Sequence, residues 1–283
     1  RARFPRAMAF LFSLPFVCAV PRLVAQEGAV YPSEKNDVTI QAIRLSEPLH
    51  LDGKLDEEIY RTAPPITKFV QQLPNSGQPA TDRSEAWVLF DDTAIYVACR
   101  CWMEFPDRIV ANDMRRDSTS ITNQDGIAIG LDTFNDHRSG YTFTLTAAGA
   151  LRDGTTNEER SNFDWNTVFD GAATRSDEGW IGEMVIPFKS LRYRQRPDQV
   201  WSINVRRVVR WRNETSFISP VPASYGGPGA TRFNVAATLV GVEVPSRSRN
   251  LELKPYVIGG VTTNNLATPA VHHDPSEIGR AHV

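Results

Sequence analysis

A succession of short alternating or β-branched runs, separated by turn residues, constrains the fold more than any other feature of the sequence. It extends through residues 43–245. Its two longest pieces are predicted hairpins: EAWVLFDDTAIYVACRCW turns at Asp91 and Asp92, and DGIAIGLDTFNDHRSGYTFTLTAAGALRDG turns at residues 135–139. Short strands with two-residue periodicity and regularly spaced turns are typical of an antiparallel β-sandwich. We therefore predict an all-β fold, an antiparallel sandwich of jelly-roll or immunoglobulin-like type.

Two further runs fit the same pattern. GWIGEMVIPFKSLRY predicts a strand that Pro187 closes, and VWSINVRRVVRW predicts a strand in which Trp201, Ile203 and Val205 point to one face. No long amphipathic helix competes with these strands.

The stretch LDGKLDEEIY carries a short helix signal, and its acids could serve as catalysts, metal ligands or helix punctuation. Leu55 and Ile59 are four residues apart and share a helical face, whereas Asp56, Glu57 and Glu58 point around the solvent side. The first turn of a helix favours acids. We therefore predict a short helix with these acids in its first turn and with Leu55 buried.

The composition is that of an ordinary globular chain. Its 283 residues carry a formal charge of -2, with 41% hydrophobic and 23% charged residues, which suffices for one large core or two modest ones. Charges of both signs are mixed along the chain and form no basic face with interleaved aromatic residues. We therefore do not expect nucleic acid as a partner.

The first 25 residues have the layout of a secretory signal peptide. RARFPR is basic, AMAFLFSLPFVCAV is apolar, and PRLVAQ offers a small residue at Ala25. The apolar run is shorter than the roughly 20 residues of a membrane-spanning helix, which favours cleavage over anchoring. We predict a signal peptide at residues 1–25, a polar lead-in at residues 26–42, and an exported product. Because the sequence does not start with Met, we expect the natural start to lie upstream.

A different pattern begins after residue 245. In RNLELKPYVIGG, apolar and polar residues alternate as in the first strand of a membrane barrel. We predict the start of a truncated barrel at residues 246–276. The last seven residues, EIGRAHV (277–283), fit no element and match an in-frame translation of a common sequencing adapter. We interpret them as an artefact and the chain as a fragment.

Six stretches occur in an order that resembles a known family: LDGKLDEEIY, VLFDDTAIYVACRC, DGIAIGLDTFNDHRSGYTFTLTAAGALRDG, FDWNTVFDG, GWIGEMVIPFKSLRY and INVRRVVRWRNETSFISPVP. Together they resemble the family 9 carbohydrate-binding-module-like domain at the front of bacterial outer-membrane barrel proteins. The likeness covers residues 43–260. In that family the first motif usually ends in Trp, where this sequence has Tyr60.

The resemblance implies a jelly-roll-like sandwich, secretion and an ancestry in sugar binding. We therefore expect a non-catalytic carbohydrate-binding module without a cofactor. Its protein would lie in the periplasm or outer membrane of a Gram-negative bacterium and take part in glycan recognition or carbohydrate catabolism. Two alternatives stay open: a domain that caps or gates an outer-membrane barrel without binding sugar, and an accessory module of an enzyme that hydrolyses O-glycosyl bonds.

Sugar sites combine flat aromatic platforms with fork-like hydrogen-bond donors. Trp165 and Trp211 lie in or beside predicted loops among polar neighbours, so they are candidate platforms. The alternative for either residue is core packing, which is the usual environment of Trp. The other tryptophans fall on predicted strands, and we assign them to the core: Trp87, Trp102, Trp180 and Trp201.

Four more residues match recurrent pieces of the family and are candidate ligand contacts: Arg138, Tyr141, Asn204 and Arg207. They would place a cluster of donors at one end of the sheet. Two alternatives are structural. Arg138 could pair with Asp132 or Asp136 and hold the hairpin loop, and Asn204 could satisfy a strand edge.

Several acids are candidate metal ligands or catalysts. Asp125 and Asp132 flank GIAIGL, and a structural calcium ion is one interpretation because oxygen ligands on sandwich loops suit calcium. No calcium-loop spacing is present, which favours paired surface acids. A glycosidase needs two carboxylates across one bond, which Glu158, Glu183 and Asp164 could supply. No hydrolase or nucleotide-binding motif accompanies them, and we predict a non-enzymatic module.

Overall fold

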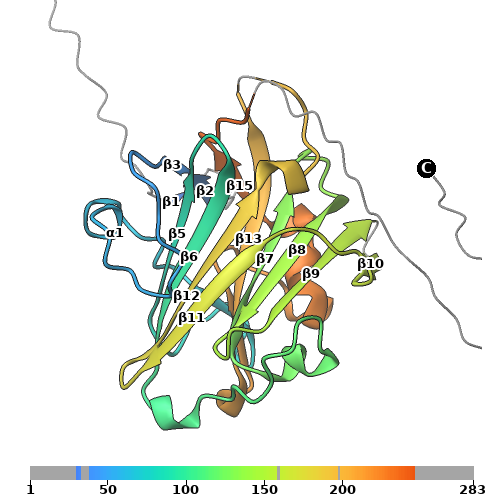
Figure 1. The fold of residues 1–283 in the computed structure, drawn as a ribbon. Helices are drawn as coiled ribbons and strands as arrows, with labels where there is room; N and C mark the ends of the chain where they lie inside the picture. Colours follow the sequence, from blue (N-terminus) through green and yellow to red (C-terminus); the bar gives the residue numbers. More distant parts are fainter. Residues whose placement is uncertain (1–29, 33–37, 158–159, 197, 246–283) are drawn as a thin grey trace, which may run out of the picture. The chain divides into compact units, whose positions relative to one another are not determined.

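The computed structural model describes residues 30–32, 38–157, 160–196 and 198–245, which form two facing β-sheets (Figure 1). The larger sheet has the order β1 (Val30–Pro32), β2 (Val38–Gln41), β15 (Ala237–Val240), β13 (Val200–Val209), β7 (Gly126–Asp132), β8 (Ser139–Thr146), β9 (Leu151–Asn157) and β10 (Arg160–Asn162), with β14 (Glu214–Phe217) beside β13 and β4 (Val70–Leu73) beside β14. The smaller sheet has the order β11 (Asp170–Ser176), β12 (Gly179–Pro187), β6 (Ala94–Trp102), β5 (Ser84–Phe90) and β3 (Ile43–Arg44).

Helical structure is limited to short turns between the strands. The one α-helix of the described residues is α1 (Ile59–Thr62). The 3-10 turns are η1 (Pro106–Arg108), η2 (Thr119–Asn123), η3 (Phe188–Ser190), η4 (Arg210–Arg212), η5 (Ala223–Tyr225), η6 (Gly227–Thr231) and η7 (Phe233–Val235). Within the described ranges, none of these helical segments has the length and apolar character needed to cross a membrane.

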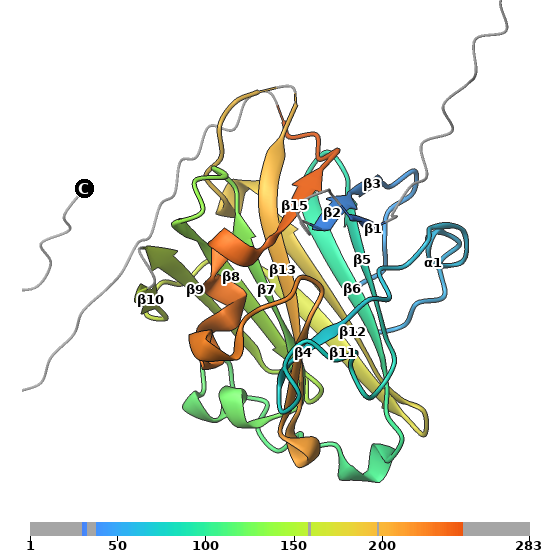
Figure 2. The same cartoon turned by 180° about the vertical axis from the view of Figure 1, so that it is seen from behind.

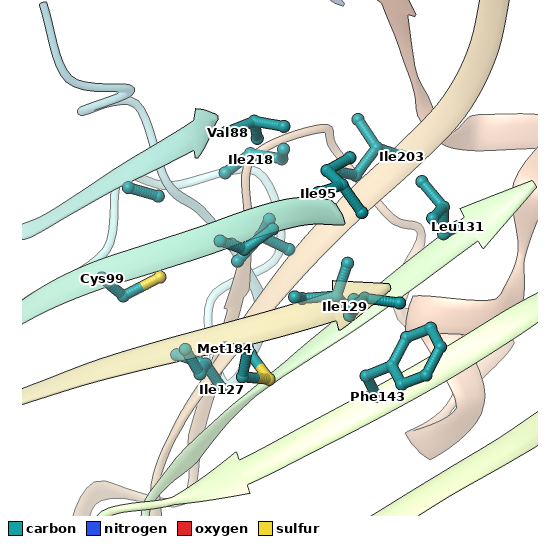
Figure 3. Close-up of a cluster of buried hydrophobic side chains, with 14 of the residues drawn as sticks. Val88, Ile95, Cys99, Ile127, Ile129, Leu131, Phe143, Met184, Ile203 and Ile218 are labelled. Carbon is teal, nitrogen blue, oxygen red and sulfur yellow. The ribbon is translucent and has the colours of Figure 1, made fainter. Parts of the chain in front are cut away.

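The main core lies between the two sheets, because one face of each strand carries the large apolar side chains. Ile127, Ile129 and Leu131 of β7 are at most 1% exposed and point toward the smaller sheet, where Cys99 and Met184 meet them (Figure 3). Their alternation with small or polar residues follows the two-residue period of a strand. The core therefore rests on the pattern that predicts the hairpins.

The predicted sandwich is confirmed. β5 and β6 form the first hairpin, β7 and β8 form the second, and β12 ends at Pro187. Two parallel pairings depart from the antiparallel expectation: β15 pairs with β2, and β3 pairs with β5. Strands β1 and β2 come from residues 26–42, which the sequence presents as a polar lead-in. β1 pairs with β2, and β2 pairs with β15, which lies almost 200 positions later in the chain. Strands this short are stable only when they are paired, so the local sequence pattern does not reveal them.

Residues 218–236 cover the outer face of the larger sheet, where η6 and η7 lie over β13, β7 and β8 (Figure 2). Glycines of the sheet let this layer approach closely. A Cβ atom added at Gly130 would lie 1.8 Å from the carbonyl oxygen of Ala230, and one at Gly140 would lie 2.5 Å from the ring of Phe233. Such distances are impossible for real side chains, so these two glycines are required for this layer to pack.

Residues 49–63, here called the opening segment, cover the outer face of the smaller sheet. Leu55 and Tyr60 are 8% exposed, and Tyr60 packs edge to face on Trp87 with ring centroids 5.4 Å apart. Burial of Leu55 is confirmed. The predicted helix is shorter than expected: α1 starts at Ile59, so Asp56 and Glu57 precede it and do not lie in its first turn. Gly53, ahead of the helix, adopts φ of +76° and leaves no room for a side chain against Thr174 of β11, so packing on the sheet fixes the chain there.

Four predictions fall on residues that the structure does not describe. The signal peptide (1–25), the barrel start (246–276), the adapter translation (277–283) and Glu158 all lie outside the described residues.

Candidate functional site

The best candidate for a ligand-binding surface lies on one side of the sandwich, where an edge of the larger sheet meets an edge of the smaller sheet. β9 and β10 form an edge of the larger sheet, β11 forms an edge of the smaller sheet, and β11 contacts β8 (Figure 1). The chain that leaves β10 must cross between the sheets to enter β11. Residues 162–169 make this crossing and place aromatic and polar side chains at the surface.

Trp165 is the central side chain of this crossing. It is half-buried and tilts against Tyr141, with ring centroids 5.3 Å apart. Tyr141 is itself fixed, because it stacks on Phe143 and its hydroxyl oxygen accepts the backbone N–H of Arg192 at 3.0 Å. Burial raises the pKa of Tyr141, so this phenol stays neutral. Trp165 is therefore an aromatic ring that is supported from behind and partly open to solvent.

Polar groups surround the exposed part of Trp165. Asp164 and Asn166 flank it in the chain, and both are exposed. Among the described residues, no acceptor bonds to the indole N–H of Trp165, and that atom is not enclosed. We call Trp165, Tyr141, Asp164 and Asn166 the Trp165 platform. It combines an apolar ring face with the carboxylate of Asp164 and the indole N–H of Trp165, which bond to no described residue.

Arg116 anchors the platform from the neighbouring loop. Its Nη2 donates to Asp153 at 2.6 Å, to Asn166 at 3.3 Å and to the carbonyl oxygen of Thr167 at 3.2 Å. Its guanidinium also lies 4.8 Å from the ring centroid of Phe169. Burial raises the pKa of Asp153, although the N–H of Thr167 and Arg116 oppose this effect. These bonds fix the position of the loop, and no described residue bonds to Nη1 of Arg116.

Trp211 has a different environment. The guanidinium of Arg212 lies 4.1 Å from its ring centroid, that of Arg108 lies at 4.9 Å, and Phe105 packs edge to face at 5.4 Å. Arg212 also forms an ion pair with Glu104. The indole N–H of Trp211 is buried and has no hydrogen-bond partner among the residues that the structure describes. Two guanidinium groups and a phenyl edge thus surround this ring, which leaves little flat surface for a sugar.

The two tryptophans also lie at opposite ends of the larger sheet. Tyr141 pairs with Leu131, which pairs with Ile203 near the start of β13. Trp211 comes just after the end of β13, in η4. The structure therefore brings Trp165 and Tyr141 together and separates both from Trp211.

Arg138 lies in the β7–β8 loop, at the same end of the sheet as Tyr141. The loop is held by acids: Asp132 accepts the N–H of Phe134 at 3.0 Å and of His137 at 2.8 Å, and Asp136 accepts the N–H of Arg138 at 2.8 Å. The side chain of Arg138 is exposed. Its position is compatible with either interpretation made from the sequence.

Asn204 and Arg207 lie in the interior of the protein. Asn204 is fully buried and exchanges long hydrogen bonds with the backbone of Ser219, at 3.4 and 3.5 Å. Arg207 is 1% exposed, and its Nη1 donates to the carbonyl oxygens of residues 82–83 and to the hydroxyl of Ser84. Both side chains join elements of the sandwich, so in this structure a ligand in solvent does not reach them.

Asp125 and Asp132 occupy opposite ends of β7. Asp125 precedes the strand and accepts the N–H of Val110 at 2.8 Å, whereas Asp132 is its last residue. Burial raises the pKa of both carboxyls. A seven-residue strand is about 20 Å long, so the two acids do not share one calcium ion. Within the described parts of the chain, no three His, Cys, Asp or Glu side chains gather at metal-binding distance.

Glu183 is an interior acid of the smaller sheet. It is 3% exposed and accepts the hydroxyl of Tyr60 and the N–H of Gly53, both at 2.9 Å. Burial is the main reason why its pKa rises to about 7; Glu57 adds to the rise, while the two hydrogen bonds oppose it. The opening segment covers this carboxylate, so it holds the segment in place and does not face a substrate. The phenol of Tyr60 supplies the side-chain donor to this carboxylate.

Sequence reasoning missed Arg116, Arg152 and Phe163. Phe163 is 40% exposed, and the guanidinium of Arg152 lies 3.7 Å from its ring centroid. The alternation in NFDWN, residues 162–166, places an aromatic residue at every second position between polar ones. That alternation was the available signal for Phe163. Arg116 is more than 35 positions away from its partners, and no local pattern links them.

Comparisons with known proteins agree with this fold of a β-sandwich module. A family model described as carbohydrate family 9 binding domain-like matches residues 51–215. Because the match covers more than half of the chain, the chain belongs to this family, which is a family of binding modules. The comparison with curated proteins gave no match.

Two solved structures share the fold. A candidate carbohydrate-binding protein from Bacteroides uniformis has a TM-score of 0.57 at 11% sequence identity, over 71% of this chain and 98% of that chain. A family 9 carbohydrate-binding module from Caldicellulosiruptor kristjanssonii, in complex with cellotriose, has a TM-score of 0.50 at 14% identity, over 77% of this chain and 100% of that chain. Identities this low establish a common fold and no more.

Proposed function

We propose that this domain is a non-catalytic module that binds carbohydrate through the Trp165 platform. Membership of the carbohydrate family 9 binding domain-like family supports the ligand class. The observation that carries the proposal is the half-buried ring of Trp165, supported by Tyr141 and flanked by exposed polar groups. The cellotriose complex of a module with the same fold points in the same direction.

The chemistry of the platform suits a neutral sugar. A pyranose ring has an apolar face, which packs on an aromatic ring, and a rim of hydroxyls, which need donors and acceptors. Asp164 and Asn166 offer acceptors, and the indole N–H and Arg116 offer donors. A few such contacts leave a single sugar in the micromolar to millimolar range, about 4–8 kcal/mol.

Calorimetry with cello- and xylo-oligosaccharides tests this function. We expect heat of binding from the wild-type chain and its loss in Trp165→Ala. Val168→Ser is the matched control, because Val168 lies in the same loop and is 64% exposed but carries no ring. Absence of heat from a well-folded sample with a broad sugar panel would replace this proposal by the structural alternative, a domain that caps a barrel without binding sugar.

We also propose that the module is exported and belongs to an outer-membrane protein that takes part in carbohydrate use. The basic and apolar layout of residues 1–25 supports export, and the resemblance to barrel-fused domains supports the membrane context. Mass spectrometry of the exported product should give a mature chain that begins near Gln26. Retention of residues 1–20 in that product would refute export by this signal.

A further inference from the structure

A groove of about 820 Å³ runs beside the C-terminal half of β11. The function proposed above does not involve this groove. Small or flexible apolar side chains, including Ile109, Met114, Ala147 and Ala173, make up part of its lining, and we call this part the floor. Met114 is 76% exposed, so most of its flexible side chain faces solvent. We call this cavity the β11 groove. Its volume lies within the range of about 300–1,000 Å³ that small-molecule sites occupy.

The rim of the β11 groove is polar and unengaged. Asp107, Asn112 and Arg175 line it and are exposed. Within the described ranges, the side chains of these three residues make no hydrogen bond or ion pair. A donor, an acceptor and an amide that can serve as either are therefore available around an apolar floor, which is the composition of a site for a neutral polar ligand.

The backbone of β11 adds further hydrogen-bonding groups. Four consecutive residues of the strand, 173–176, line the groove, so the groove meets the edge of the strand and not just one face. In the described part of the smaller sheet, β11 pairs with β12 alone. Every second backbone N–H and C=O therefore points away from β12 and toward an occupant of the groove.

The groove and the Trp165 platform lie on the same side of the sandwich. Trp165 comes five residues before β11, near Tyr141 at the start of β8, whereas the groove lies at the end of β11, beside Ala147 just after β8. The length of β11 separates them, about 20 Å. Arg116 lies between them, because it bonds to Asn166 on the platform side and follows Met114 of the groove by two residues.

We infer that the β11 groove and the Trp165 platform form one extended binding site for an uncharged polysaccharide chain. The inference rests on the proposed function and specifies its ligand: an internal stretch of several sugar residues that runs along the edge of β11, not a single sugar or a chain end. One end packs on Trp165, the middle passes Arg116, and the other end lies over the alanine floor and bonds to Asn112 and Arg175.

Calorimetry with a length series from mono- to hexasaccharide tests the inference. With wild-type protein we expect affinity to rise at least about tenfold from the disaccharide to the hexasaccharide, because linked subsites bind in concert. The double variant Asn112→Ala/Arg175→Ala should lose this gain but keep the disaccharide affinity. Trp165→Ala should weaken every length. Lys189→Ala, an exposed change at η3, is the control and should match wild type.

The possible outcomes separate this inference from the proposed function. Equal affinity for the disaccharide and hexasaccharide would overturn the extended site and leave the sugar platform standing. Wild-type affinity of the groove variant for every length would do the same. No binding of any length to folded protein would refute the proposed function itself. Thermal melts of each variant show whether it is folded, and both groove substitutions are at exposed positions.

Discussion

The opening segment and the crossing at residues 162–169 look alike in sequence and behave differently in the structure. Both are irregular, both carry acids and aromatic residues, and both cover part of a sheet. In the opening segment, Tyr60 and Gly53 bond to the buried Glu183, and His50 donates its N–H to Glu57 at 3.0 Å. In the crossing, Asp164 offers a carboxylate that no described residue binds.

This difference shows how to separate structural polarity from functional polarity. A polar group that the protein already satisfies contributes to stability, because leaving it unpaired would cost free energy. A polar group at an exposed, supported ring contributes little to stability and stays available to a ligand. We therefore expect changes in the opening segment to alter stability, and changes in the crossing to alter binding.

The largest effect is expected at Leu55. Leu55→Ala removes a side chain that packs between the opening segment and the smaller sheet, which should lower the free energy of unfolding by about 2–5 kcal/mol. Urea unfolding measures the change. The affinity for sugar should not change at a temperature where the variant is folded. A variant as stable as wild type would show that the opening segment is not held by this contact.

The next effect is a pH dependence from Glu183, whose pKa rises from the ordinary 4.5 to about 7 because the side chain is buried. The folded state then keeps a proton that the unfolded state releases above pH 4.5. Stability should therefore fall as pH rises from about 4.5 to 7, by up to about 3 kcal/mol, and stay level above pH 7.

Glu183→Gln isolates this contribution. The Gln amide can donate to the Tyr60 oxygen while its carbonyl accepts the Gly53 N–H, so both contacts persist without a titrating group. Unfolding curves across pH 4.5–7 should be flatter in the variant than in wild type. Parallel curves for the two proteins would mean that Glu183 is ionised throughout and that the pKa argument is wrong.

Trp165→Ala should affect binding and not stability. A central aromatic contact is typically worth about 2 kcal/mol or more, which corresponds to roughly a thirtyfold loss of affinity. Trp211→Ala is the comparison, because it removes a ring of similar exposure that arginine side chains surround. It should bind sugar like wild type and unfold more easily. The reverse result would exchange the roles of the two tryptophans.

The smallest effect is expected from Asp56, Glu57 and Glu58. Their joint replacement by Gln should change stability by less than about 1 kcal/mol, since Asp56 and Glu58 are exposed and the ion pair of Glu58 with Arg61 is solvated. Thermal unfolding measures this directly. A loss comparable to that of Leu55→Ala would mean that these acids, and not the apolar contact, hold the segment.

Much of the fold could be predicted from the sequence, because many of its strands show an alternation of apolar and polar residues that is visible locally. Trp201, Ile203 and Val205 alternate along β13 and are all fully buried. Some of the strands that escaped prediction have a partner far away in the chain, such as β2 beside β15. The short helix starts later than the pattern predicts, at Ile59, for a related reason: Gly53 and Tyr60 bond to Glu183, which lies more than 120 positions later in the chain.

The site was harder to predict, because exposure depends on distant residues. Trp165 and Trp211 have similar polar neighbours in sequence, and both are half-buried. Arg108 comes from a loop about 100 positions before Trp211 and covers its ring, while no described arginine covers the ring of Trp165. Asn204 and Arg207 fail as ligand contacts for the same reason: residues 82–84 and Ser219 approach from other parts of the fold and enclose them.

The central claim is that sugar packs on Trp165, and an NMR titration of the tryptophan indole N–H signals tests it most directly. The chain has six tryptophans, so the assigned spectrum is simple. On addition of a cello- or xylo-hexasaccharide, we expect a progressive shift of the Trp165 signal, while the signals of the buried Trp180 and Trp201 and of Trp211, whose indole N–H is buried, stay in place. Binding that shifts Trp211 and leaves Trp165 unmoved would contradict it.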